Sequence, residues 1–67
     1  MKISKNIIAA YNRMLEAESN DAEFGTVATK RAVTRATNVM WKKIKAEYPD
    51  LDMKGKIAIQ TKLLEMA

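Results

Sequence analysis

The residues of this chain best suited to do chemistry are six cations that lie close together in the middle of the sequence. They are Lys30, Arg31, Arg35, Lys42, Lys43 and Lys45, and no acidic residue lies between positions 24 and 46. The whole chain has a net charge of +4, so this stretch contributes a surplus that the rest of the chain partly cancels. Segregated positive charge attracts phosphates or acidic protein surfaces. The chemistry that it indicates is electrostatic binding of a partner.

Helical spacing brings most of these cations onto one face. On a helix over residues 26–48, that face carries Arg31, Arg35, Asn38, Lys42 and Lys45, with Lys30 and Lys43 at its flanks. The steps of three, four and seven residues give a row about 20 Å long. An α-helix of this length fits a nucleic-acid groove, where Arg and Lys contact phosphates and Arg or Asn hydrogen-bonds to base edges.

The same face has a second interpretation, since Lys and Arg also form ordinary solvated surfaces. The absence of acidic residues favours binding, because an inert face would gain from pairs of opposite charge one turn apart. The leading hypothesis is a small non-enzymatic nucleic-acid-binding accessory or regulatory protein that uses this face on the phosphates of DNA or RNA. The alternative is a helical protein-binding module, an inhibitor or adaptor, that docks the face on an acidic protein. A helix at a membrane surface is the weakest of the three classes, and no segment is apolar enough to cross a bilayer.

Two aromatic residues, Trp41 and Tyr48, fall at the edge of the basic face. A base could stack on either ring, as in proteins that bind single strands. A single Trp in a small helical protein more often anchors the core, and we favour that interpretation.

Catalytic chemistry has little support in this sequence. It contains no His and no Cys, which removes the commonest general base, the thiol nucleophile and the usual ligands of zinc. The one dense set of carboxylates is Glu16, Glu18, Asp21 and Glu23, and its spacing is not that of a calcium loop. We therefore expect no enzyme, no metal and no cofactor.

The elements that must position the basic face are helical, and the fold class that we predict is all-α with three helices. The first helix spans residues 4–18, with Ser4 as its N-cap and apolar residues at steps of three and four. We expect it to end at Ser19, Asn20 and Asp21, whose side chains compete for backbone hydrogen bonds. Phe24 would then lie in a loop of roughly six residues and fold back onto the core.

The second helix is predicted to begin at Thr26 and to end at Tyr48, because Pro49 disfavours helical geometry in the residue before it. Its core stripe is Val33, Met40 and Ile44. A third helix follows over residues 53–66, capped by Asp50 or Asp52. Neither the long second helix nor the loop before it suits a helix-turn-helix motif.

A strip of small residues adjoins the core stripe of the long helix: Ala28, Ala32, Ala36 and Val39. Small residues at this spacing let another helix approach closely. If the first and third helices do not cover the strip, it provides a homodimer interface, and self-association would help a chain of 67 residues that buries only about 60% of its unfolded surface. We expect one domain over residues 1–67, in the cytoplasm.

Overall fold

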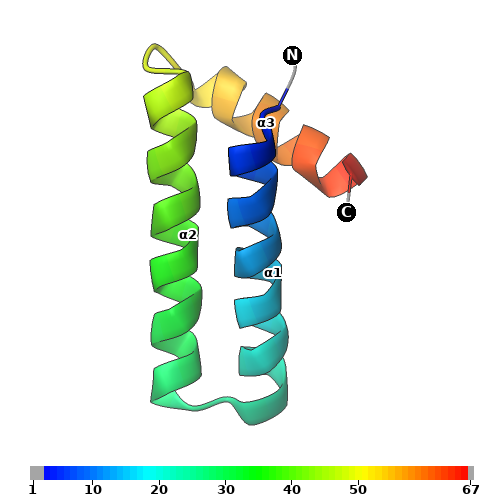
Figure 1. Cartoon of the computed structure of the whole chain (residues 1–67), viewed down its shortest axis with the longest axis vertical. Coiled ribbons are helices and arrows are strands. Elements are labelled where there is room, and N and C mark those ends of the chain that lie inside the picture. The colour runs from blue at the N-terminus through cyan, green and yellow to red at the C-terminus, as the bar shows by residue number, and fades with distance from the viewer. Residues whose placement is uncertain (1–2, 67) are drawn as a thin grey trace.

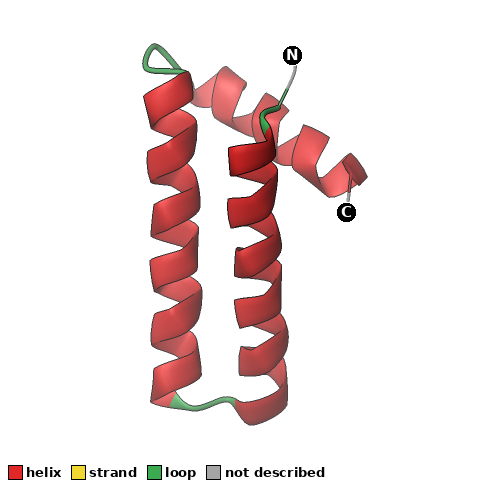
Figure 2. Ribbon diagram, in the orientation of Figure 1, coloured by secondary structure: helices red, strands yellow, loops and turns green. Residues whose placement is uncertain are grey.

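The computed structural model describes residues 3–66, which form three α-helices: α1 (Lys5–Phe24), α2 (Val27–Glu47) and α3 (Met53–Met66). α1 and α2 lie side by side and antiparallel, and α3 crosses their open end (Figure 1). Only short connections separate the helices (Figure 2), and the described residues contain no strand. The all-α, three-helix prediction is confirmed; residues 1, 2 and 67 of the predicted domain lie outside the described range.

The first helix begins where the sequence predicts and ends later. Ser4 is its N-cap, and the Ser4 hydroxyl oxygen accepts a hydrogen bond from the N–H of Ile7 at 3.3 Å. The predicted end at residue 18 is wrong, because the helix continues through Ser19 and Asn20. Both side chains are exposed, so water can satisfy their hydrogen bonds and they do not compete with the helical backbone. Gly25 ends it with φ 59°, a left-handed conformation suited to glycine, and its N–H donates to the carbonyl of Asp21 at 2.7 Å.

The predicted position of Phe24 is also wrong. Phe24 is the last residue of α1 and is 64% exposed, so it does not fold back onto the core. Only Gly25 and Thr26 connect the first two helices, in place of the loop of six residues that we expected. The short connection makes an antiparallel hairpin, whereas the helices of a helix-turn-helix motif cross at about 90–120°.

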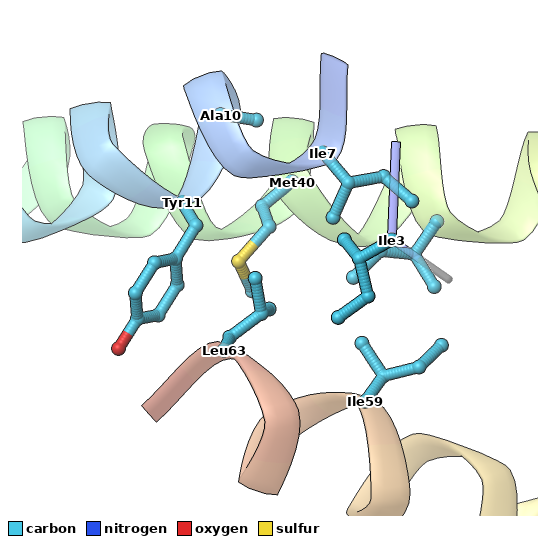
Figure 3. Close-up of a cluster of buried hydrophobic side chains, with 8 residues drawn as sticks. Ile3, Ile7, Ala10, Tyr11, Met40, Ile59 and Leu63 are labelled. Atoms are coloured by element: carbon cyan, nitrogen blue, oxygen red, sulfur yellow. The ribbon is translucent and has the colours of Figure 1, made fainter. Parts of the chain in front are cut away.

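The core lies at the open end of the hairpin, where all three helices meet. Its fully buried large side chains are Ile7, Ile44, Ile59 and Leu63, and around them lie Ile3, Ala10, Tyr11 and Met40 (Figure 3). No residue between 12 and 39 is buried. Val33 of the predicted core stripe is therefore only half-buried, because α3 does not reach the part of the hairpin where it lies.

Two hydrogen bonds fix the open end. The Ser4 hydroxyl donates to the carboxylate of Glu47 at 2.7 Å and so joins the start of α1 to the end of α2. At the start of α3 the Asp52 carboxylate accepts from the N–H of Gly55 at 2.8 Å, so Asp52 is the cap and Asp50 is not. Gly55 also leaves room for Leu51, since a Cβ at that position would lie 2.5 Å from the Leu51 Cδ1.

Candidate functional site

The helix that carries the basic face, α2, is continuous from end to end. It contains neither Gly nor Pro, and Thr26 caps it: the Thr26 hydroxyl accepts from the N–H of Thr29 at 3.1 Å, and the Thr29 hydroxyl oxygen accepts from the N–H of Thr26 at 2.9 Å. At the other end the N–H of Tyr48 donates to the carbonyl of Ile44, and Pro49 then prevents the helix from continuing. Lys45 lies in the last turn, where its positive charge interacts favourably with the negative end of the helix dipole.

The structure places the predicted face opposite the buried side of α2, in contact with solvent. Met40 and Ile44 mark the buried side, and all five residues of the face are exposed: Arg31, Arg35, Asn38, Lys42 and Lys45. Two shallow depressions run along it and meet at Arg35 and Asn38, which line both. The five side chains therefore form one continuous surface.

None of the cations on this face is neutralised within the described chain. Among residues 3–66, Arg31, Arg35, Lys42 and Lys45 form neither ion pairs nor side-chain hydrogen bonds. The acidic residues nearest in sequence, Glu23 and Glu47, lie at opposite ends of the helix region, and the Glu47 carboxylate already accepts from Ser4. The charges on the face repel one another and are available to an anionic partner.

The two flanking lysines differ in their surroundings. Lys30 is exposed and lines the same depression as Arg31 and Arg35. Lys43 is half-buried and lies on the side of α2 that carries Ala36, so it is separated from the main row. The structure thus brings six of the seven predicted binding residues together and sets Lys43 apart.

The small-residue strip of α2 is only partly covered. Ala36 is half-buried, whereas Ala28 and Ala32 are exposed and Val39 is 41% exposed. A narrow groove between α1 and α2 exposes part of the strip, namely Ala32, Ala36 and Val39, and its other lining residues are Ala10, Arg13 and Arg35. α1 therefore packs against one edge of the strip and leaves the other edge open.

Sequence reasoning missed two cations that tertiary structure adds to the face. Arg13 of α1 lies across the groove from Arg35. Lys56 of α3 shares a depression with Lys45 and places its ammonium 6.0 Å from the centre of the Trp41 ring, within the range of a cation–π contact. Their sequence neighbourhoods give no signal, because their positions depend on how the helices pack.

The aromatic residues at the edge of the face lie against the core. Trp41 and Tyr48 are both half-buried and pack on the buried cluster, in agreement with the core interpretation. Trp41 also lines the depression that Arg35, Lys42 and Lys45 line. An aromatic surface is thus accessible next to three cations.

Of the four carboxylates near the hairpin turn, Asp21 contacts the cap of α2. Asp21 lies with one carboxylate oxygen 2.8 Å from the hydroxyl of Thr29, which is also 2.8 Å from the carbonyl of Thr26; the hydroxyl proton is donated to one of the two. Within residues 3–66, no three acidic side chains gather in a way that would hold a metal ion. No buried polar side-chain atom in the described chain lacks a hydrogen-bond partner.

Of the helices in the described range, none has both the length and the apolar character needed to pass through a membrane. The chain matches no protein-family model, no curated protein and no solved structure.

Proposed function

We propose that this protein binds nucleic acid through the outer face of α2, chiefly by contacts to phosphates. The observation that supports the proposal is the continuous exposed row from Arg31 to Lys45, in which four cations have no carboxylate partner in the described chain. Like charges one turn apart destabilise a helix by about 0.2–0.5 kcal/mol per pair, and a bound polyanion would remove this repulsion. A phosphate backbone supplies anionic groups at regular, similar spacing.

The chemistry of the row suits a phosphate contact at each end and a base contact between them. Arg31 and Arg35 present planar guanidinium groups, which hydrogen-bond to two phosphate oxygens at once. Lys42 and Lys45 add compact charges about three turns away. Asn38 lies between the two pairs, where its amide can donate and accept toward a base edge.

Arg13 widens the proposed contact beyond α2. Because Arg13 lies across the α1–α2 groove from Arg35, its charge adds one phosphate contact beside the row on α2. A backbone that follows α2 would meet Arg35 and Arg13 together. We include Arg13 in the binding surface for this reason.

The proposal is tested by fluorescence anisotropy with labelled DNA and RNA over a series of salt concentrations. Binding should weaken steeply with salt, because each neutralised phosphate releases counterions. The double substitution Arg31→Ala with Arg35→Ala should reduce the slope of log Kd against log salt by about two units, and Arg13→Ala should reduce it by about one.

A matched control removes the same charge elsewhere. Lys5 and Lys62 are exposed and lie on α1 and α3, outside the face, so the pair Lys5→Ala with Lys62→Ala should leave the slope nearly unchanged. Equal slopes for the two double variants would refute the assigned face, and an absence of binding at about 10 μM protein in low salt would refute nucleic-acid binding altogether. Capture of one acidic protein that persists after nuclease treatment would instead support a protein-binding module.

A further inference from the structure

One side of α3 carries an apolar stripe that the rest of the described chain leaves uncovered. Met53, Ile57 and Leu64 are 71%, 56% and 68% exposed, and steps of four and seven residues put them on one line of the helix. This line lies about 120° around the helix from the buried Ile59 and Leu63. α3 therefore has two apolar sides, and only one of them packs against the hairpin.

The stripe continues into an apolar groove on the hairpin. Leu64 lines this groove together with Met14 and Leu15 of α1, which are half-buried, and with Trp41 of α2. The groove is lined by all three helices and lies beside the place where α3 crosses the hairpin. Leu64 joins stripe and groove into one surface, whereas Phe24 and Val39, at the turn and on α2, lie apart from it.

The molecule exposes more surface than a compact monomer of its mass would. The chain has an accessible surface of 5102 Å² and a mass of 7.6 kDa. A compact monomer of this mass exposes about 4300 Å². The difference of about 800 Å², which the elongated hairpin and α3 share, equals in size what one partner contributes to an interface of standard size. The radius of gyration, 12.4 Å, likewise exceeds the value of about 11 Å for a compact domain of this length.

We propose that this stripe is the interface between two copies of the chain, with α3 of one copy antiparallel to α3 of the other about a two-fold axis. In that arrangement Met53 of each copy lies opposite Leu64 of the other. Ile57 lies opposite Gln60, whose amide is close to the axis and can hydrogen-bond to the same amide of the second copy. A two-fold interface requires such a self-complementary surface.

The charges beside the stripe favour a second copy in this orientation. Antiparallel pairing brings Lys54 of each copy near Glu65 of the other, and both residues are exposed and without an ion pair in the described chain. A parallel arrangement would instead place like charges together. Two opposite-charge pairs thus form on association, and they select the antiparallel orientation.

This interface differs from the small-residue strip of α2 in what it buries. Ala28 and Ala32 expose only methyl groups, and Val39 is the one larger apolar residue there. The α3 stripe buries three long side chains and leaves Arg31 and Arg35 free. Dimerisation through α3 therefore does not depend on the nucleic-acid proposal.

Sedimentation equilibrium of the full chain tests the proposal over concentrations from about 10 μM to about 1 mM. The wild-type mass should rise toward twice 7.6 kDa. Leu64→Lys should raise the dimer Kd by about tenfold or more, since it places a charge against Met53 of the second copy in an apolar contact. Val27→Lys is the matched control: Val27 is 66% exposed at the hairpin turn, and its variant should dimerise as the wild type does.

A charge exchange tests the orientation without altering the stripe. Glu65→Lys should weaken the dimer because it faces Lys54 of the second copy, and adding Lys54→Glu should restore it. Circular dichroism should show equal helix content in all these variants, since every substituted residue is exposed. A monomeric wild type at about 1 mM, or loss of the dimer in Val39→Lys but not in Leu64→Lys, would overturn the proposal.

Discussion

Gly25 holds the hairpin turn in a backbone conformation that residues with a side chain seldom adopt. Its φ of 59° is the only positive value in the described chain. A Cβ at this position would meet no neighbouring residue closely, since the nearest atom, the carbonyl oxygen of Asp21, lies 3.8 Å away. The conflict would be with the residue's own backbone, and in the left-handed region it costs about 1–2 kcal/mol.

We predict that Gly25→Ala lowers the free energy of unfolding by about 1 kcal/mol. Urea denaturation followed by circular dichroism measures this as a lower midpoint at unchanged slope. Gly25→Asn is the control, because Asn tolerates the left-handed region better than Ala; it should lose less. Equal midpoints for wild type and Gly25→Ala would mean that the turn relaxes at no cost.

Thr29 shows where prediction from single residues fails. Its position on the helical wheel places it beside the core stripe, yet in the structure its hydroxyl completes the cap of α2 and contacts Asp21. The usual capping box has Glu or Gln three residues after the cap. A Thr in that place gives no such signal, so the contact that ties α1 to α2 at the turn could not be predicted.

Among the elements, α3 depends on the fewest contacts. α1 and α2 pack against each other along the hairpin, whereas α3 contributes only Ile59 and Leu63 to the buried set. Short helices have little stability of their own in water. Packing of these two side chains, together with the Asp52 cap, therefore decides whether α3 stays folded on the hairpin.

Hydrogen exchange should reveal this difference. We predict that amides of α3 exchange faster than those of the hairpin around Ile7 and Ile44, because α3 opens without unfolding the rest. Ile59→Ala should cost about 2–4 kcal/mol where α3 is docked and should abolish protection in α3 first. Simultaneous loss of protection in all three helices would show one cooperative unit.

Helix periodicity predicted the elements well where strong stop signals exist. Pro49 and the residues around it set the end of α2, and both α2 and α3 lie within one residue of their predicted bounds. Ser19 and Asn20 misled the prediction for α1, because exposed polar side chains can remain in a helix with their groups in water. Gly25 was the true terminator.

At the scale of the whole molecule, repulsion among the cations of the α2 face lowers the stability of the folded state. The cations of the face lie at helical spacing with no opposite charge between them, and like charges one turn apart destabilise a helix by about 0.2–0.5 kcal/mol per pair. Salt screens this repulsion, with a screening length of about 10 Å at 0.1 M salt and about 3 Å at 1 M. The folded state should therefore be more stable in high salt than in low salt.

Arg35→Glu tests this opposition directly. It replaces a repulsive i to i+4 pair with Arg31 by an attractive one, so we predict a gain of a few tenths of a kcal/mol in the free energy of unfolding at low salt. Nucleic-acid affinity should fall in the same variant, since two units of charge change in the middle of the face. A variant that is more stable and binds equally well would remove Arg35 from the binding surface.

The candidate site was predictable as far as a single helix determines it. Spacing alone placed Arg31, Arg35 and Lys42 on one exposed face. The half-buried position of Lys43 and the approach of Arg13 and Lys56 depend on how α1 and α3 pack on α2. No pattern within one helix contains that information.

The two-residue connection between α1 and α2 has a kinetic consequence. Because the hairpin pairs segments that are near in sequence on either side of Gly25, closing it costs little chain entropy, and proteins dominated by local contacts fold in microseconds to milliseconds. We expect the hairpin to form first and α3 to dock afterwards. Substitutions at the turn should then slow refolding, whereas substitutions at Ile59 should chiefly accelerate unfolding.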